Sequence, residues 1–265
     1  DAGVKFMIAE NHRFLPAHQY IHDAIQDGLV GDVFLVRAFE GVNEIPALSQ
    51  PDFWKGDPIK AGGGAFMDMG AHKFATLEWI LEDEVESVIA MLSKQVAILT
   101  EKAEDNALAM VRFANGAVGE IVVSFTQVAP PFNSLEIHGT RGIILENHMR
   151  EKPVRIYSHH EVMAEHKHQW FEPDIEHAPF PGYYAISAKY VDEDFARCIL
   201  EDREPEFTPE QAKSAIAGVL MGYLSAQTGK AATRDDLMEV AANMGTRSLL
   251  ENLTEYIPTN ENLRR

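Results

Sequence analysis

Residues 62–79 read GGGAFMDMGAHKFATLEW, and the predicted fold and site are both built around this stretch. Its three glycines allow positive φ or a close approach to a ligand. Apolar residues then recur at helical spacing, which predicts a helix. Asp68 and His72 share one face of its first turn if the helix has begun at Asp68. A carboxylate beside an imidazole orients the ring for general acid–base chemistry. Alternatively, Asp68 caps the helix and His72 is an ordinary, partly buried histidine.

Composition excludes several classes of partner. Lys and Arg total 23 against 41 Asp and Glu, which gives a net charge of −18 over 265 residues. Such a surface repels phosphate backbones and anionic lipid, so we expect neither nucleic acid nor membrane as a partner. Apolar runs all fall short of the ~20 residues of a membrane span. The single cysteine, Cys198, excludes an intrachain disulfide and indicates a reducing compartment, hence a cytoplasmic location.

The first residues of the chain predict a strand followed by a polar segment. Residues 4–9 (VKFMIA) are nearly all apolar, as in a strand buried on both faces of a parallel sheet. Asn11, His12 and Arg13 follow at its carboxyl end, where ligands bind in open α/β sheets. The alternative is a polar loop that caps the next helix. A strand this close to the start needs a sheet to join, so we expect a chain taken from the middle of a larger fold.

The next part of the chain predicts a helix, a strand and a long loop. Residues 16–26 form a helix with Pro in its first turn. His18 and His22 are four residues apart and could hold a metal, but a third ligand is missing nearby, which favours a solvated helix face. A strand at 32–40 precedes loop 41–61, whose length is typical of functional loops. In that loop Trp54 and Lys55 line a pocket, or Trp54 pins the loop to the core.

The second half predicts a sheet built from hairpins. Asn115-Gly116 and residues 139–141 each separate two strands, the pattern of a mainly antiparallel sheet with helices on one face. The fold class is therefore α/β, more closely α+β. The expected strands are 86–92, 106–114, 117–125, 134–138, 142–146 and 154–157, and the expected helices are 184–201 and 208–228.

A histidine-rich segment lies between the last strand and the next helix. Residues 159–177 contain five histidines, a composition that suggests metal binding. The segment lacks the second histidine of an HExxH zinc helix, and no cysteine is present in it. A pocket wall or an oligomer contact is therefore favoured, and the sequence predicts no metal site.

Five segments, in order, resemble the glucose–fructose oxidoreductase/inositol dehydrogenase (Gfo/Idh/MocA) family. They are FMIAENHRFLPAHQYIHDAIQDGLVGDVFLV, GGGAFMDMGAHKFATLEWIL, EDNALAMVRFANGAVGEIVVSF, LEIHGTRGIILE and FARCILEDREPEFTPEQAKSAIAGVLMGYLSAQTGK. The resemblance implies an N-terminal Rossmann domain for NAD or NADP and a C-terminal domain with a large, mostly antiparallel sheet. It also implies a sugar or cyclitol substrate, hydride transfer at a secondary carbinol carbon, and a homo-oligomer (dimer or tetramer) formed through the open sheet face.

The resemblance also assigns roles to residues. The family's Asp-x-x-x-His falls on Asp68 and His72, so His72 becomes the general acid/base and Asp68 orients it or the substrate. Asn11 and Arg13 match a loop near the nicotinamide and the substrate. Trp54 and Lys55 fall where family members often have an aromatic/basic pair beside the substrate.

Two departures from the family matter. Ala75 stands where many members have a further Asp. The Rossmann glycine fingerprint and the Glu-Lys-Pro segment with its catalytic lysine are both absent. We therefore expect residues 1–12 to be a remnant of the cofactor domain and residues 13–265 to form the substrate-binding and oligomerising domain.

The favoured function is an NAD(P)-dependent sugar or polyol oxidoreductase. The competing classes are a non-catalytic carbohydrate-binding or scaffold protein and a metal-dependent enzyme that uses the histidine-rich segment. The sequence does not choose between NAD and NADP.

Overall fold

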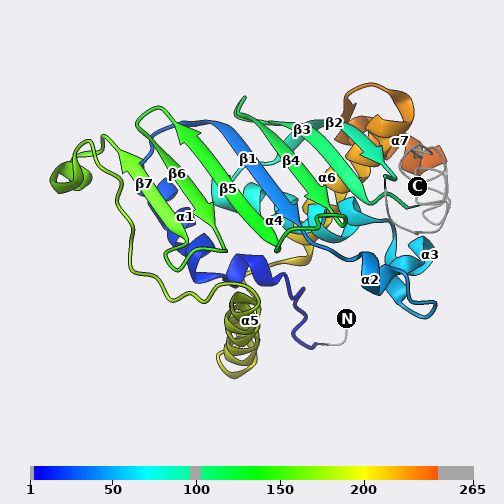
Figure 1. Cartoon of the computed structure of the whole chain (residues 1–265), viewed down its shortest axis with the longest axis horizontal. Helices are drawn as coiled ribbons and strands as arrows, with labels where there is room; N and C mark the ends of the chain where they lie inside the picture. Colours follow the sequence, from blue (N-terminus) through cyan, green and yellow to red (C-terminus); the bar gives the residue numbers. More distant parts are fainter. Residues whose placement is uncertain (1–2, 96–102, 244–265) are drawn as a thin grey trace.

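The centre of the computed structural model, which describes residues 3–95 and 103–243, is one eight-stranded sheet (Figure 1). Within this part of the chain β1 and β4 are parallel and the other neighbouring pairs are antiparallel, so the predicted mostly antiparallel sheet is confirmed. The strand order is β7 (Val154–Ser158), β6 (Gly142–Asn147), β5 (Phe132–Gly139), β1 (Val33–Gly41), β4 (Val118–Ser124), β3 (Asn106–Phe113), β2 (Val85–Ser93) and β8 (Ala232–Thr233).

Helices cover one face of this sheet and leave the other open. Figure 1 looks onto the open face, with α1 (Pro16–Gln26), α4 (Ala71–Leu81) and α6 (Pro209–Thr228) behind it. The strands alternate accordingly: in β3, Ala109 and Val111 are buried against the helices, whereas Met110 between them is exposed.

Local signals place the helix ends and hairpins where the sequence predicts them. Thr208 and Gln211 form a capping box at the start of α6, and Gly229 ends the helix in the left-handed conformation. Gly116 has a φ of 93° in the turn between β3 and β4, which pair as the predicted hairpin.

The remaining elements connect or flank the sheet. Loop 41–61 contains three short helices, α2 (Ile45–Leu48), η2 (Trp54–Gly56) and α3 (Pro58–Ala61). The helix α5 (Gly182–Leu200) projects from the sheet layer, as Figure 1 shows, and Cys198 on it is buried. The others are η1 (Asn11–Phe14), the π-helix η3 (Phe66–Gly70), η4 (Glu161–His166) and α7 (Arg234–Asn243). No helix of the described ranges is long and apolar enough to cross a bilayer.

Two predictions are wrong in this chain. Residues 4–9 form no strand: Val4 is 74% exposed and Phe6 60%, because no described strand lies beside them to accept their hydrogen bonds. His18 does not lie on a solvated helix face but is fully buried, since α1 turns that side toward β6. Residues 1–2 and 244–265 of the predicted domains lie outside the described residues.

Candidate functional site

The triple glycine packs against another part of the chain rather than against a ligand. A Cβ atom on Gly64 would lie 1.9 Å from the backbone oxygen of Glu104, so only glycine fits there. The backbone N–H groups of Gly64 and Phe66 donate to the Glu104 carboxylate, as does the Tyr223 hydroxyl at 2.8 Å. This buried carboxylate therefore satisfies the free N–H groups where the helical segment begins.

The three glycines are followed by the π-helix η3, which continues directly into α4. Asp68 lies in η3, and its side chain caps neither helix. Its Oδ2 atom instead accepts a hydrogen bond from Nζ of Lys55 at 2.8 Å, with both side chains about one-third exposed. The sequence prediction that these two residues share a site is consistent with this ion pair, whereas the predicted cap is wrong.

The carboxylate that contacts His72 comes from Glu10. Nδ1 of His72 lies 2.6 Å from Oε2 of Glu10, while Oε1 of Glu10 accepts from the backbone N–H of His12 at 2.8 Å. Glu10 caps the 3₁₀-helix η1, and this cap holds its carboxylate in place. The carboxylate in turn orients the His72 ring.

The charges around His72 favour its protonated form. Burial lowers the pKa of His72, but the charge and hydrogen bond of Glu10, with smaller effects of Glu40 and Asp68, raise it overall to about 9. The His72 side chain remains 31% exposed, and its Nε2 atom forms no hydrogen bond within the described part of the chain. His72 can therefore hold a proton at Nδ1 and exchange another at Nε2.

A stacked histidine lies against this ring. The rings of His12 and His72 are 4.3 Å apart and nearly parallel. Burial and the neighbouring cations His72 and Lys73 lower the pKa of His12 well below its usual value, so His12 is neutral. A neutral ring can pack on the His72 imidazolium without adding a second positive charge.

Behind His72 lies a buried ion pair. Lys73 is fully buried, with Nζ 3.0 Å from Oε2 of Glu40 and 2.5 Å from Oδ1 of Asn133. Glu40 ends β1 and Asn133 begins β5, so this lysine ties the first turn of α4 to two central strands. Lys73 lies within the helix that the sequence predicts, but the sequence does not predict its buried contacts with Glu40 and Asn133.

Of the other predicted site residues, Asn11 and Arg13 do not contact His72. Asn11 donates to the hydroxyl of Ser187 on α5 at 3.0 Å. The guanidinium of Arg13 lies 4.7 Å above the Trp79 ring, two helical turns or about 10 Å along α4 from His72. Trp54 is 51% exposed beside Lys55, so it does not anchor the loop in the core.

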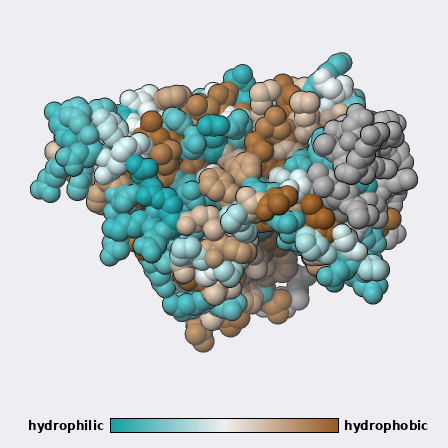
Figure 2. Space-filling model, in the orientation of Figure 1, coloured by the Kyte–Doolittle hydropathy of each residue, from teal (hydrophilic) through white to brown (hydrophobic). Residues whose placement is uncertain are grey.

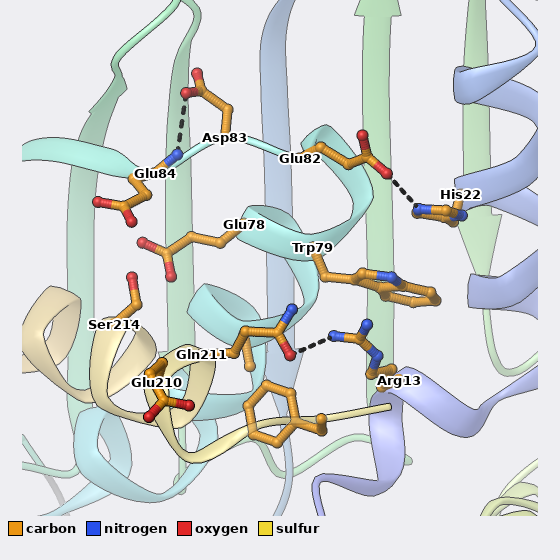
Figure 3. A pocket seen from close by; sticks show the side chains of 12 residues that line it. Arg13, His22, Glu78, Trp79, Glu82, Asp83, Glu84, Glu210, Gln211 and Ser214 are labelled. Atoms are coloured by element: carbon orange, nitrogen blue, oxygen red, sulfur yellow. Dashed lines mark hydrogen bonds and ion pairs between the residues drawn. The ribbon is translucent and has the colours of Figure 1, made fainter. Parts of the chain in front are cut away.

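Arg13 lines a groove of about 530 Å³ between α4, α6 and η1, which Figure 3 shows from close by. The side of the groove near Arg13 holds the Trp79 ring, with the His22 ring stacked on it at 4.7 Å. The acidic residues that line the groove are Glu78, Glu82, Asp83, Glu84 and Glu210. None of the residues that line this groove belongs to the Glu10–His72 pair.

Residues 18–145 match the family described as the GFO/IDH/MocA C-terminal domain. This match takes in just under half of the chain, and that segment is similar to the GFO/IDH/MocA C-terminal domain. Two relatives are a 1,5-anhydro-D-fructose reductase from Ensifer adhaerens, 32% identical over 58% of this chain and 45% of the reductase, and a myo-inositol 2-dehydrogenase from Thermotoga maritima, 31% identical over 58% and 44%. The chain thus spans about half the length of the curated relatives it matches.

Solved structures show the same fold at lower identity. A levoglucosan dehydrogenase in complex with NADH and levoglucosan superposes with a TM-score of 0.74 over 88% of this chain and 67% of that one, at 21% identity. An oxidoreductase domain protein from Kribbella flavida superposes with a TM-score of 0.71 over 87% and 67%, at 20% identity. This chain therefore shares its fold with these oxidoreductases.

Sequence reasoning misses two residues that organise the site, Glu10 and Glu104. Both are buried polar side chains, and each contacts a partner at least 38 residues away. A signal for Glu10 exists in its position one residue before Asn11, within the segment that carries the family resemblance. Spacing alone pairs His72 with the nearest carboxylate, Asp68, because only a tertiary contact brings Glu10 close.

Proposed function

We propose that this chain forms the substrate-binding part of an NAD(P)-dependent oxidoreductase that acts on a secondary alcohol of a sugar or cyclitol. The relatives described above support the chemical class, since their names include sugar and inositol dehydrogenases and reductases. The observation that carries the proposal is the Glu10–His72 pair, a partly exposed imidazole held by a buried carboxylate.

In this proposal His72 moves the hydroxyl proton. Oxidation of a carbinol carbon releases that proton, and Nε2 of His72 accepts it while Glu10 stabilises the imidazolium. In the reverse direction the imidazolium donates the same proton to the carbonyl oxygen of the product. Because the pKa of His72 is raised to about 9, the imidazolium is the resting form at neutral pH, which favours the reducing direction.

Substrate hydroxyls have charged and aromatic partners close to this ring. Lys55 and Asp68 form one ion pair at 2.8 Å, which presents a donor and an acceptor side by side. Burial raises the pKa of Tyr184 on α5, with smaller effects of Glu40 and Asp68, so this tyrosine keeps its proton. We propose that Lys55 and Asp68 bind adjacent hydroxyls, with Trp54 beside them.

The described residues do not form a dinucleotide site. No glycine-rich strand–turn–helix unit occurs among them, and Gly63 and Gly64 pack against Tyr223 and Glu104. Hydride exchange is the chemistry expected of NAD or NADP, and we propose that a Rossmann domain outside residues 13–265 holds it. Asn11 and Arg13 remain candidates for contacts to that domain or its cofactor.

The open sheet face supports a homo-oligomer. Figure 2 shows apolar side chains across this face, and Ile89, Met91, Leu108, Met110 and Val118 are all exposed on neighbouring strands. Contiguous exposed apolar patches mark interaction surfaces. We propose a dimer or tetramer built on this face, and a cytoplasmic location in keeping with the free, buried Cys198.

The decisive experiment uses the protein expressed from its native gene. Its intact mass should exceed the 29.6 kDa of this chain by roughly the size of one nucleotide domain. A panel of sugars and cyclitols is then screened for NAD(P) reduction, and the corresponding ketoses for NAD(P)H oxidation. His72→Ala should lower turnover by about 10²–10⁴ without loss of fold.

The competing functions give different results. A carbohydrate-binding or scaffold protein would bind sugars with no turnover, and His72→Ala would leave that binding intact. An enzyme that depends on metal at residues 159–177 would lose turnover when its histidines, such as His166 and His168, are replaced. Near-wild-type turnover of His72→Ala would overturn the proposed role of His72.

A further inference from the structure

A second cluster of buried ligand-type side chains lies beside the proposed catalytic pair and takes no part in it. His18 on α1, Glu146 on β6 and His148 just after β6 are all fully buried or nearly so. One ligand atom from each lies within 4.8 Å of the others. Glu146 and His148 are two residues apart on an extended chain, so both face the helix layer that carries His18.

The tautomer of His18 is fixed by its neighbour. Nδ1 of His18 lies 2.7 Å from the backbone oxygen of His12, which can only accept, so Nδ1 carries the proton. Nε2 therefore holds a lone pair, is fully buried and has no hydrogen-bond partner. A histidine that donates one N–H to a backbone carbonyl and points the other nitrogen at an empty polar site has the arrangement of a metal ligand.

The other two side chains are also unsatisfied. Neither oxygen of Glu146 and neither ring nitrogen of His148 has a hydrogen-bond partner in the described part of the chain. Oε1 of Glu146 and Nε2 of His148 are only 2.9 Å apart, yet their orientation is not that of a hydrogen bond. The charge of Lys73 acts on Glu146 only through space, because its ammonium is paired with Glu40. Unpaired buried polar atoms of this kind are costly and call for a ligand.

We propose that His18, Glu146 and His148 bind one zinc-type divalent cation. Two imidazoles and one carboxylate are a common zinc ligand set, with the fourth position left to water or another group. Imidazoles that share a tetrahedral zinc at bonds of about 2.0–2.1 Å have ring centroids about 5 Å apart. The centroids of His18 and His148 are 5.1 Å apart, with the rings nearly perpendicular.

The site would act on structure rather than on substrate. All three ligands are buried, so the cation enters as α1 docks on the sheet. It then fixes His18, whose Nδ1 holds the His12 carbonyl, and the His12 ring stacks on His72. His177, in the histidine-rich segment, contacts this cluster: its Nε2 atom lies 3.0 Å from the backbone oxygen of His148. The cation would thus hold in place the η1 segment that carries Glu10.

The test measures metal content and affinity of the protein from its native gene. We expect about one equivalent of zinc by mass spectrometry after dialysis, and tetrahedral visible bands when Co²⁺ replaces Zn²⁺ in the stripped protein. His18→Ala and Glu146→Gln should each weaken Zn²⁺ binding at least about 100-fold in competition with a chromophoric chelator. The matched control is His22→Ala, four residues along α1, where the ring stacks on Trp79 instead (Figure 3).

Several outcomes would overturn the site. One is a wild-type protein that takes up neither excess Zn²⁺ nor Co²⁺, which would mean that Glu146 and His148 share a proton instead. Another is loss of binding in His72→Ala with binding retained in His18→Ala, which would place the metal on Glu10, His12 and His72. If His18→Ala fails to fold, the wild-type Co²⁺ spectrum decides, since a sulfur charge-transfer band would assign the metal to Cys198.

Discussion

Nδ1 of His72 lies 2.6 Å from Oε2 of Glu10, a residue 62 positions earlier in the chain. Through this contact a buried carboxylate sets the charge of a partly exposed imidazole. The pair therefore connects the end of the extended N-terminal segment to the first turn of α4, and it makes the first turn of α4 sensitive to how η1 is placed.

Replacing Glu10 by Gln should move the pH dependence of catalysis. Burial lowers the pKa of His72, but Glu10 raises it to about 9, so the imidazolium persists at neutral pH. In the reducing direction, where His72 donates a proton, kcat/KM should fall as the pH rises through about 9 in the wild type. In Glu10→Gln the pKa is lower, so this fall should begin at lower pH.

The measurement is kcat/KM against pH for both proteins, with Glu86→Gln, an exposed carboxylate on β2, as control. Identical profiles for the wild type and Glu10→Gln would show that Glu10 does not tune the acting group.

The relation between Glu10 and His72 also shows what the sequence could predict. Signals between near neighbours were sufficient for the helix start at Thr208, the stop at Gly229 and the hairpin at Asn115-Gly116. Such signals depend on backbone conformation within a few residues, so they need no knowledge of the fold.

Contacts between distant segments could not be predicted in the same way. Residues 4–9 have the composition of a strand, but a strand also needs a neighbour, which the described residues do not supply. His18 has the spacing of an exposed pair with His22, yet β6 buries it beside Glu146. Spacing gives the face of a helix but not the element that packs on it.

Lys55 should contribute to substrate binding more than to turnover. Its ammonium lies 2.8 Å from Asp68 and is partly exposed, so it can donate to a sugar hydroxyl. Lys55→Met should raise KM by roughly 10- to 100-fold, the value of one lost hydrogen bond to a charged group, with a smaller change in kcat. Lys60→Met on α3 is the matched control, because Lys60 is an exposed lysine in the same loop. An unchanged KM in Lys55→Met would remove Lys55 from the substrate site.

Glu104 should be important for stability. Glu104→Ala leaves two backbone N–H groups, of Gly64 and Phe66, and the Tyr223 hydroxyl without their buried acceptor. At about 1–3 kcal/mol for each unsatisfied group, unfolding should become easier by about 3 kcal/mol or more. Denaturant unfolding of Glu104→Ala, with the exposed Glu86→Ala as control, measures this loss, and equal midpoints would contradict it.

The same substitution has a predicted pH dependence. Burial raises the pKa of Glu104 to about 7, above its ordinary 4.5, so the folded state holds this proton more tightly than the unfolded state. Its contribution to stability is complete below pH 4.5 and is lost as the pH rises through 7. The difference between wild type and Glu104→Ala should therefore be larger at pH 5 than at pH 8.

The buried Lys73–Glu40 pair should show strong coupling. Lys73→Met leaves the Glu40 carboxylate buried without its cation, which typically costs about 3–5 kcal/mol. The double variant Lys73→Met/Glu40→Leu removes both charges and should be more stable than Lys73→Met alone. A double-mutant cycle from urea unfolding tests this, and additive single effects would mean that the two charges do not interact.

The open sheet face gives a prediction about assembly. Met110 is 57% exposed in the middle of β3, opposite Ile89 of β2 on one side and Glu120 of β4 on the other, and an oligomer through this face would bury it. Met110→Glu would place a second carboxylate beside Glu120 in that interface, so the dimer or tetramer should dissociate. Met238→Glu on α7 is the control, because Met238 is 62% exposed away from the sheet. Sedimentation velocity of the three proteins measures the masses. A monomeric wild type, or a Met110→Glu variant that keeps the wild-type mass, would assign this apolar face to some other contact.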